Sequence, residues 1–267
     1  MKTVLSAMVF CIFWQINAQQ QVFAYDYRNV PEEELRTFMG NEAMYWSKIH
    51  ANLIKKGTIT GWTMCQRVNG LASEPNIYFF YGIGSLENRD KMTEAWPQAE
   101  KEVRSSMDKQ KLAMIDERLK QKKYRVGEVL LRRTSSVNMG NEGDWNYLVH
   151  NYAKASDVAQ FLAGQEKHFK PFFEENISAK NTKQVFWYAA TVLSPTGSGY
   201  SWNCYTVDAF KNYSDVFNSW NTEPNWPQEG MDEVNKYLPD GNFYKSVVWQ
   251  KVMWLDAEGQ LKTAWDQ

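Results

Sequence analysis

The chain has 267 residues, a length that corresponds to one large domain or two small ones. Its 14 Phe, 14 Tyr and 12 Trp supply enough large apolar side chains for two sizeable cores, which excludes an intrinsically disordered chain. The 30 Lys and Arg are balanced by 31 Asp and Glu, so the chain lacks the basic excess that drives binding to nucleic acid. We therefore expect a folded protein with no nucleic-acid partner.

Residues 1–18 have the pattern of a secretory signal peptide. Lys2 precedes an apolar stretch that is too short to cross a membrane, and a small residue suited to cleavage follows at Ala18. We therefore expect cleavage after Ala18, a secreted or periplasmic protein, and no membrane span in the mature chain.

An internal repeat is the most informative feature of the sequence. A shift of 124 positions aligns residues 22–88 with residues 146–212 without a gap, and it matches Gly40 with Gly164. The triplet Trp-Pro-Gln also recurs later in each half. We predict a duplication, with a first repeat over residues 19–134, a polar linker over 134–144 and a second repeat over 145–256.

Both halves show the same succession of periodic patterns. In the first half, strands are expected over residues 23–27, 59–68, 77–83 and 124–133, and helices over about 35–53 and 88–122. In the second half, strands are expected over 146–150, 184–193, 200–207 and 243–255, and helices over about 162–177 and 209–238. The order β-α-β-β-α-β is that of a ferredoxin-like unit, which predicts an α+β fold built from two such units.

The predicted strands are apolar on both faces. Along residues 184–193, one face carries Val185 and Trp187 and the other carries Phe186 and Tyr188. A sheet face that is apolar must be covered, so we expect helices on one side and the sheet of the other repeat on the second.

This duplicated pattern resembles the dimeric α/β-barrel superfamily, which includes antibiotic-biosynthesis monooxygenases, stress-responsive barrel proteins and chlorite dismutase-like haem proteins. The resemblance implies two repeats packed sheet to sheet as an intramolecular barrel, with a ligand or cofactor held between the sheets. It is a resemblance of pattern over nearly the whole mature chain and implies no particular reaction.

Polar residues on these strands are the candidate ligand-binding residues. Asp26 and His150 coincide under the 124-residue shift, so the two side chains either form an acid–base or ligand-holding pair or meet water at strand ends. Further polar strand residues are Gln66, Glu128, Arg132, Asn203 and Gln250, and possible flat walls of a pocket are Trp62, Trp187, Tyr188 and Trp202. Each of these is individually typical of a structural or core residue as well.

Two carboxylates lie on apolar helix stripes, Glu42 in the first half and Glu166 in the second. A carboxylate on an apolar face needs a partner, so each is interpreted as a structural hydrogen-bond acceptor or as an acid–base group with a raised pKa. Its presence in both halves favours the structural role. Cys65 and Cys204, with three His in the chain, do not form a metal-binding motif, so no metal site is expected.

Three functions stay open at this level. The first is binding of a small molecule in an aromatic-lined cavity between the repeats, and the second is catalysis in that cavity by a cofactor-independent oxygenase or a haem protein, the latter dependent on His150. The third is an interaction module for a glycan or a protein. A buried polar cluster around Asp26 and His150 favours the first two functions, and a filled barrel favours the third.

Overall fold

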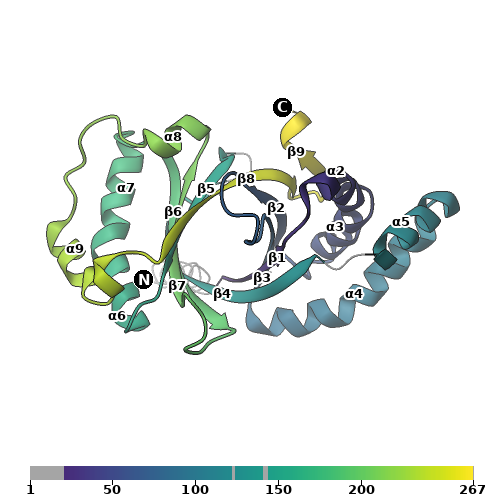
Figure 1. Ribbon diagram of the computed structural model, residues 1–267, viewed down its shortest axis with the longest axis horizontal. Coiled ribbons are helices and arrows are strands. Elements are labelled where there is room, and N and C mark those ends of the chain that lie inside the picture. Colours follow the sequence, from purple (N-terminus) through teal and green to yellow (C-terminus); the bar gives the residue numbers. More distant parts are fainter. Residues whose placement is uncertain (1–20, 122–123, 141–143, 267) are drawn as a thin grey trace, which may run out of the picture.

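The computed structural model describes residues 21–121, 124–140 and 144–266, so the expected signal peptide and its cleavage site lie outside the described residues. Eight antiparallel strands form a closed barrel in the order β2-β3-β1-β4-β6-β7-β5-β8, and β8 pairs with β2 to complete it. A short ninth strand, β9, extends the sheet beside β8. Helices cover the barrel from two opposite sides (Figure 1).

The strands are β1 Val22–Arg28, β2 Gly61–Arg67, β3 Ile77–Gly84, β4 Arg125–Val137, β5 Tyr147–Ala153, β6 Gln184–Ser194, β7 Cys204–Phe210, β8 Lys245–Leu255 and β9 Leu261–Thr263. The helices of the first half are α2 Glu32–Asn41, the π-helical turn η1 Glu42–Trp46, α3 Ser47–Lys55, α4 Leu86–Ser106 and α5 Lys109–Gln121. The helices of the second half are α6 Val158–Gly164, the π-helical turn η3 Gln165–Phe169, α7 Lys170–Ser178, α8 Tyr213–Phe217 and α9 Gln228–Asn235.

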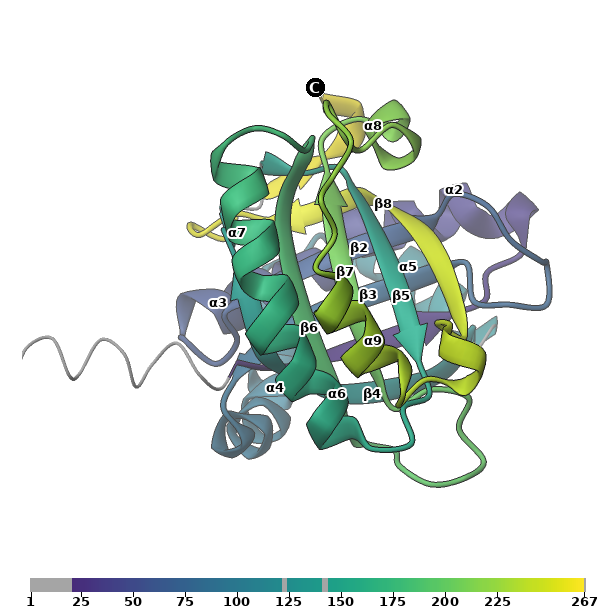
Figure 2. The same ribbon diagram turned by 90° about the vertical axis from the view of Figure 1, so that its left-hand side faces the viewer.

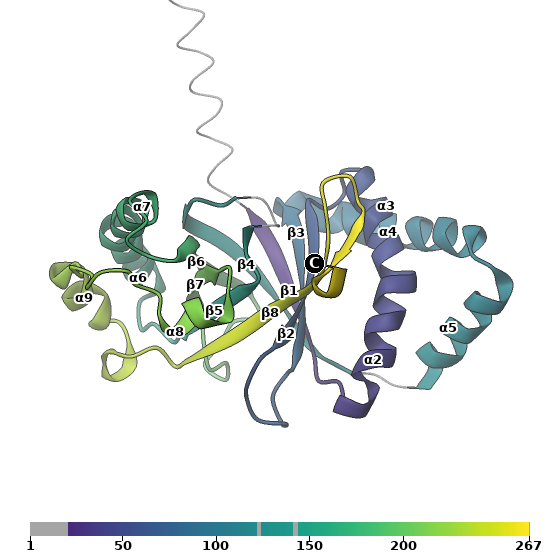
Figure 3. The ribbon, with the colours of Figure 1, turned by 90° about the horizontal axis from the view of Figure 1, so that it is seen from above.

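The elements of each half follow one another in the predicted order. Strands run β2-β3-β1-β4 across the first half and β6-β7-β5-β8 across the second, which is the same arrangement twice. Figure 2 shows α6, α7 and α9 in front of β6, β7 and β5, and Figure 3 shows the helices of the two halves at opposite ends of the molecule. The predicted α/β barrel is therefore confirmed as a fold.

The two halves are joined through strand edges as well as through apolar faces. β4 pairs with β6, and β2 pairs with β8, so the free edges of each four-stranded sheet are closed by the other sheet. An unpaired edge leaves backbone N–H and C=O groups without partners, and barrel closure satisfies them. The doubly apolar strands follow from this geometry, because one face lies inside the barrel and the other lies under helices.

Aromatic side chains fill the middle of the barrel. The Tyr25 and Tyr188 hydroxyls are 2.6 Å apart, and the rings of Tyr78 and Trp249 have centroids 4.7 Å apart. The interior cavity that Tyr25 and Tyr188 line measures only about 50 Å³. Large rings from both halves thus fill the barrel around Tyr25 and Tyr188, so the ligand cavity expected between the two repeats does not lie at this level of the barrel.

Two predicted boundaries also need correction. β4 continues to Val137, so the expected linker over 134–144 begins inside a strand, and its residues 141–143 lie outside the described part of the chain. The helix expected over 209–238 is two short helices instead, and α9 begins directly after Pro227. Proline has no N–H to donate and is disfavoured inside a helix. Among the described residues, no helix has both the length and the hydropathy needed to cross a membrane.

Candidate functional site

A large cavity lies outside the barrel, between the first half's sheet and its helices. This first pocket has a volume of about 530 Å³. The residues used below are Asp26, Arg28, Glu42, His50, Tyr81 and Arg125, all of which line it. The strands β1 and β3 form its floor, and α2, η1, α3 and α5 contribute to its walls.

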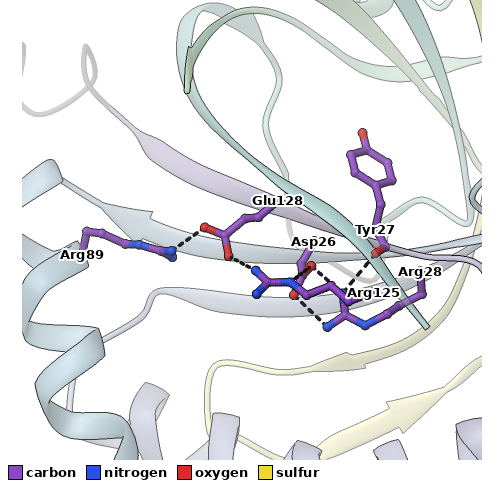
Figure 4. Close-up of polar contacts among 6 residues, drawn as sticks. All are labelled: Asp26, Tyr27, Arg28, Arg89, Arg125 and Glu128. Carbon is purple, nitrogen blue, oxygen red and sulfur yellow. Dashed lines mark hydrogen bonds and ion pairs between the residues drawn. The ribbon is translucent and has the colours of Figure 1, made fainter. Parts of the chain in front are cut away.

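Strand alternation places the charged residues of β1 in this pocket. Tyr25 and Tyr27 project into the barrel, so Asp26 and Arg28 project to the outer face. Figure 4 shows the Tyr27 side chain leaving the strand on the side opposite to Asp26. Arg28 Nη2 donates to Asp26 Oδ2 at 2.7 Å, and Arg125 Nε donates to Asp26 Oδ1 at 2.9 Å. Asp26 is thus held between two guanidinium groups.

The charge network continues along β4 to a helix. Arg125 Nη2 donates to Glu128 Oε2 at 2.9 Å, and Glu128 is also paired with Arg89 of α4 (Figure 4). Asp26 is almost buried and Arg125 is about half exposed, so the network runs from the wall of the pocket to its rim. Bonds of this charge-assisted kind fix the positions of the guanidinium groups.

Glu42 is the carboxyl group of this pocket that has no fixed partner. It is the first residue of η1 and is only 7% exposed, and no hydrogen bond or ion pair among the described residues involves its side chain. The pKa of Glu42 is raised to about 8, mainly by burial; the charge of Arg28 opposes the rise and the charge of Asp26 adds to it. The structure thus places Glu42 among the buried residues, and a carboxyl with no hydrogen bond among the described residues fits the acid–base interpretation better than the structural one.

His50 of α3 lines the same pocket as Glu42. Its ring stacks on Trp62 with centroids 5.1 Å apart and an interplanar angle of 16°, and it also contacts Tyr81 and Trp96. In the part of the chain that the structure describes, neither ring nitrogen has a hydrogen-bond partner. Burial lowers the pKa of His50 to about 3, so the imidazole is neutral at physiological pH.

The expected pairing of Asp26 with His150 is wrong. His150 projects into the barrel, where its ring stacks on Tyr25 at 5.3 Å, whereas Asp26 lies on the outer face. Asp26 is the fifth residue of β1, and the fifth residue of β5 is Asn151, so the 124-residue shift misaligns these strands by one position. A slip of one residue moves a side chain to the opposite face of a sheet.

The expectation for Glu166 fails for the same reason. η1 begins at Glu42, and η3 begins at Gln165, one position earlier than the shift implies. Gln165 is therefore the buried residue, while Glu166 is half exposed and pairs with Lys170 at 2.6 Å. A π-helical turn rotates the following residues relative to a regular α-helix, which the stripe of apolar residues did not reveal.

The remaining aromatic candidates lie in three different places. The Trp62 ring stacks on His50, which lines the first pocket. Trp187 lies on the outer face of β6, against Phe173 of α7. Tyr188 lies inside the barrel. Trp202 packs on Tyr152 at one mouth of the barrel, with ring centroids 4.8 Å apart.

The remaining polar candidates do not form a site. Both ends of the Asn203 side-chain amide bond the backbone of Ala155, so this residue has a structural role. Gln66 pairs with Gln250 across β2 and β8, and Arg132 lies on β4 opposite Thr191. Gln250 and Arg132 line none of the cavities described here, and Glu128 is the polar strand candidate that joins the charge network.

A smaller cavity of about 280 Å³ lies at the barrel mouth, and both halves line it. Tyr27 and Tyr152 meet there with hydroxyls 3.3 Å apart. Glu74 forms ion pairs with Arg67 at 2.9 Å and with Lys245 at 2.8 Å, so these three charged side chains of the cavity are already paired with one another. The described residues thus leave an aromatic-lined space between the halves at this mouth of the barrel.

Sequence reasoning missed four residues of the first pocket, namely Arg28, His50, Tyr81 and Arg125. The signal for Arg28 was present, because it follows Asp26 by two residues on the same strand face. His50 directly follows Ile49, a residue of the apolar stripe, so its position at the edge of that stripe was the signal for its burial. Within the described residues, no group of three or more His, Cys, Asp or Glu could hold a metal ion.

Comparison with known proteins supports the fold. A candidate monooxygenase from Fusobacterium nucleatum superimposes with a TM-score of 0.51 at 10% sequence identity, covering 92% of this chain and 95% of that one. A candidate monooxygenase from Lactobacillus acidophilus gives 0.50 at 10% identity, with coverages of 92% and 97%. An anthrone oxidase-like protein gives 0.50 at 11% identity, with coverages of 90% and 94%. No protein-family model and no curated protein sequence matches the chain.

Proposed function

We propose that the protein binds a small aromatic molecule carrying an acidic hydroxyl group in the first pocket, and that Glu42 exchanges a proton with that hydroxyl. The observation that carries this proposal is a buried carboxyl without a hydrogen bond in the wall of a cavity of about 530 Å³. Aromatic side chains offer flat contacts for the body of the ligand, and Arg28 lies close enough to act on the charge of Glu42.

The protonation states suit this exchange. With a pKa of about 8, Glu42 is mostly protonated at neutral pH and still has an ionised fraction that accepts a proton. An oxyanion left on the ligand would be stabilised by the guanidinium of Arg28. His50 is neutral and serves as a flat wall and a hydrogen-bonding group.

A second candidate function is oxidation of the bound molecule by O2 in the same pocket. Loss of a proton to Glu42 makes an aromatic substrate electron-rich, which is the condition for direct reaction with O2. Two of the similar structures are candidate monooxygenases and a third is anthrone oxidase-like, which makes anthrone a suitable probe. In this reaction one anthrone and one O2 would give one anthraquinone and one water.

The other functions drawn from the sequence have less support. A haem at His150 does not fit, because this ring is 0% exposed and packs against Tyr25, Tyr78 and Trp249, with no room for a porphyrin. The filled barrel matches the condition set for an interaction module. The cavity of about 530 Å³ under the helices of the first half, however, supports binding of a small molecule.

Binding of 1-naphthol, with naphthalene as the matched compound without a hydroxyl, tests the proposal by isothermal titration calorimetry. We expect 1-naphthol to bind more tightly, and Glu42→Gln to remove up to about tenfold of that preference, the upper end of what one hydrogen bond contributes. Glu166→Gln is the matched control in the other half and should bind like the wild type. Equal affinity for the two compounds, or equal behaviour of the two variants, would refute the proposal.

The oxidase candidate has its own test. Anthrone consumption and O2 uptake should be stoichiometric with wild-type protein and should fall at least about tenfold in Glu42→Gln, in keeping with the usual contribution of a general base. Binding of 1-naphthol without O2 uptake from anthrone would retain the binding function and exclude this oxidation.

Two further points are proposals as well. We infer that the two halves arose by duplication, in view of their shared strand order. Export with cleavage after Ala18 is tested by determining the N-terminal residue of the protein recovered from the producing cell and its medium.

A further inference from the structure

A second ligand-sized cavity lies under the helices of the other half. This second pocket has a volume of about 440 Å³ and is lined by residues of β5, β6 and β7 and of η3, α7 and α9. Most of its walls are apolar, and three of them are indole rings, those of Trp187, Trp220 and Trp226.

The second pocket does not repeat the chemistry of the first. Position by position, Glu42 at the start of η1 is replaced by Gln165 at the start of η3. His50, the fourth residue of α3, is replaced by Phe173, the fourth residue of α7. The proton-exchanging groups of the first pocket are therefore absent at the matching positions of the second, so the two pockets are suited to different ligands.

One ionisable group faces this cavity, the carboxyl of Asp208 on β7. Asn151 Nδ2 donates to Asp208 Oδ2 at 2.7 Å, and Gln184 Nε2 donates to Oδ1 at 2.7 Å. Both donors are neutral amides, and no ion pair among the described residues involves Asp208. Neither Lys, Arg nor His occurs among the residues that line the pocket.

Burial raises the pKa of Asp208 to about 6, and the two amide donors oppose this rise, so the group is mainly ionised at neutral pH. A carboxylate in an apolar cavity is costly unless an opposite charge is nearby. Each of its oxygens accepts one amide hydrogen and retains further acceptor capacity. The pocket thus combines an anion that has no protein cation with aromatic faces that attract cations.

We propose that the second pocket binds an organic ammonium ion, with its apolar body between the indole rings and its cationic nitrogen on Asp208. The ligand supplies the positive charge that the protein does not place beside Asp208. Its hydrogen-bonding partner is the Asp208 carboxylate, which Asn151 and Gln184 hold in position. This site is separate from the first pocket and does not depend on its function.

Tryptamine and its neutral analogue tryptophol, which carries a hydroxyl in place of the amine, test the proposal by isothermal titration calorimetry near neutral pH. We expect tryptamine to bind at least about tenfold more tightly than tryptophol, since a hydrogen bond between charged groups outweighs a neutral one. Asp208→Asn should abolish that preference. Asp232→Asn, the same change at an exposed position of α9, should retain it.

Glu42→Gln separates the two sites, because it should weaken binding of 1-naphthol and leave binding of tryptamine unchanged. Equal affinity of the wild type for tryptamine and tryptophol would overturn the proposal, as would an unchanged preference in Asp208→Asn. Failure of both tryptamine and hexylammonium to bind the wild type would also overturn it. The comparison of ligands on the wild type decides the matter even if Asp208→Asn does not fold.

Discussion

Replacing Glu42 by Gln should change how the stability of the protein depends on pH. The carboxyl has a pKa of about 8 in the folded protein, against an ordinary value of 4.5. The folded state therefore holds a proton that the unfolded state releases between these two values. Stability falls as pH rises through this window, because the folded state binds more protons than the unfolded state. The full penalty at high pH is about 5 kcal/mol at 1.36 kcal/mol per pKa unit.

Gln keeps the size of the side chain and removes the ionisation. The free energy of unfolding of Glu42→Gln, minus that of the wild type, should thus become more positive by about 3 kcal/mol from about pH 5 to about pH 8. Urea unfolding of both proteins at several pH values measures this difference, and other titrating groups cancel in it. Glu166→Gln is the control and should show no such trend, because Glu166 is half exposed. A pH-independent difference for Glu42→Gln would refute a raised pKa at this position.

Three other perturbations have defined outcomes. Asp26→Asn should destabilise the protein by about 1–3 kcal/mol at neutral pH in urea unfolding, because the largely buried Arg28 loses its charged acceptor; an unchanged midpoint contradicts this. Burial lowers the pKa of His150 to about 3, so the unfolded state binds a proton that the folded state does not, and the contribution of His150 to the free energy of unfolding should rise by about 2 kcal/mol from about pH 5 to about pH 7. Urea unfolding of the wild type and of His150→Phe should show this rise in the difference between the two proteins, and a pH-independent difference would show that folding does not lower the pKa of His150. Cys65 and Cys204 are buried and form no disulfide in the described residues, so a thiol reagent should label them only after denaturant is added, and rapid labelling of the native protein would contradict their burial.

Hydrophobic periodicity by itself determined the order of the elements. Strands apolar on both faces and helices with one apolar stripe have patterns that depend only on local burial, so the β-α-β-β-α-β order could be read twice from the chain. The buried position of Glu42 followed from the same logic, because it lies on the apolar stripe of its helix. The need to cover both faces of the sheets also followed from composition along the strands.

Tertiary structure decided where the empty space is. Whether Tyr25, Tyr188 and Trp249 line a cavity or fill it depends on how rings from different strands interlock, and the barrel centre proves to be filled. The face on which Asp26 and His150 lie depends on a register that one residue reverses, and no local pattern fixes it across a duplication. Asp208 acquires its uncompensated charge only because β5, β6 and β7 place amides beside it and no cation. Contacts between residues distant in sequence thus determine both pockets, while the sequence alone determines the elements that enclose them.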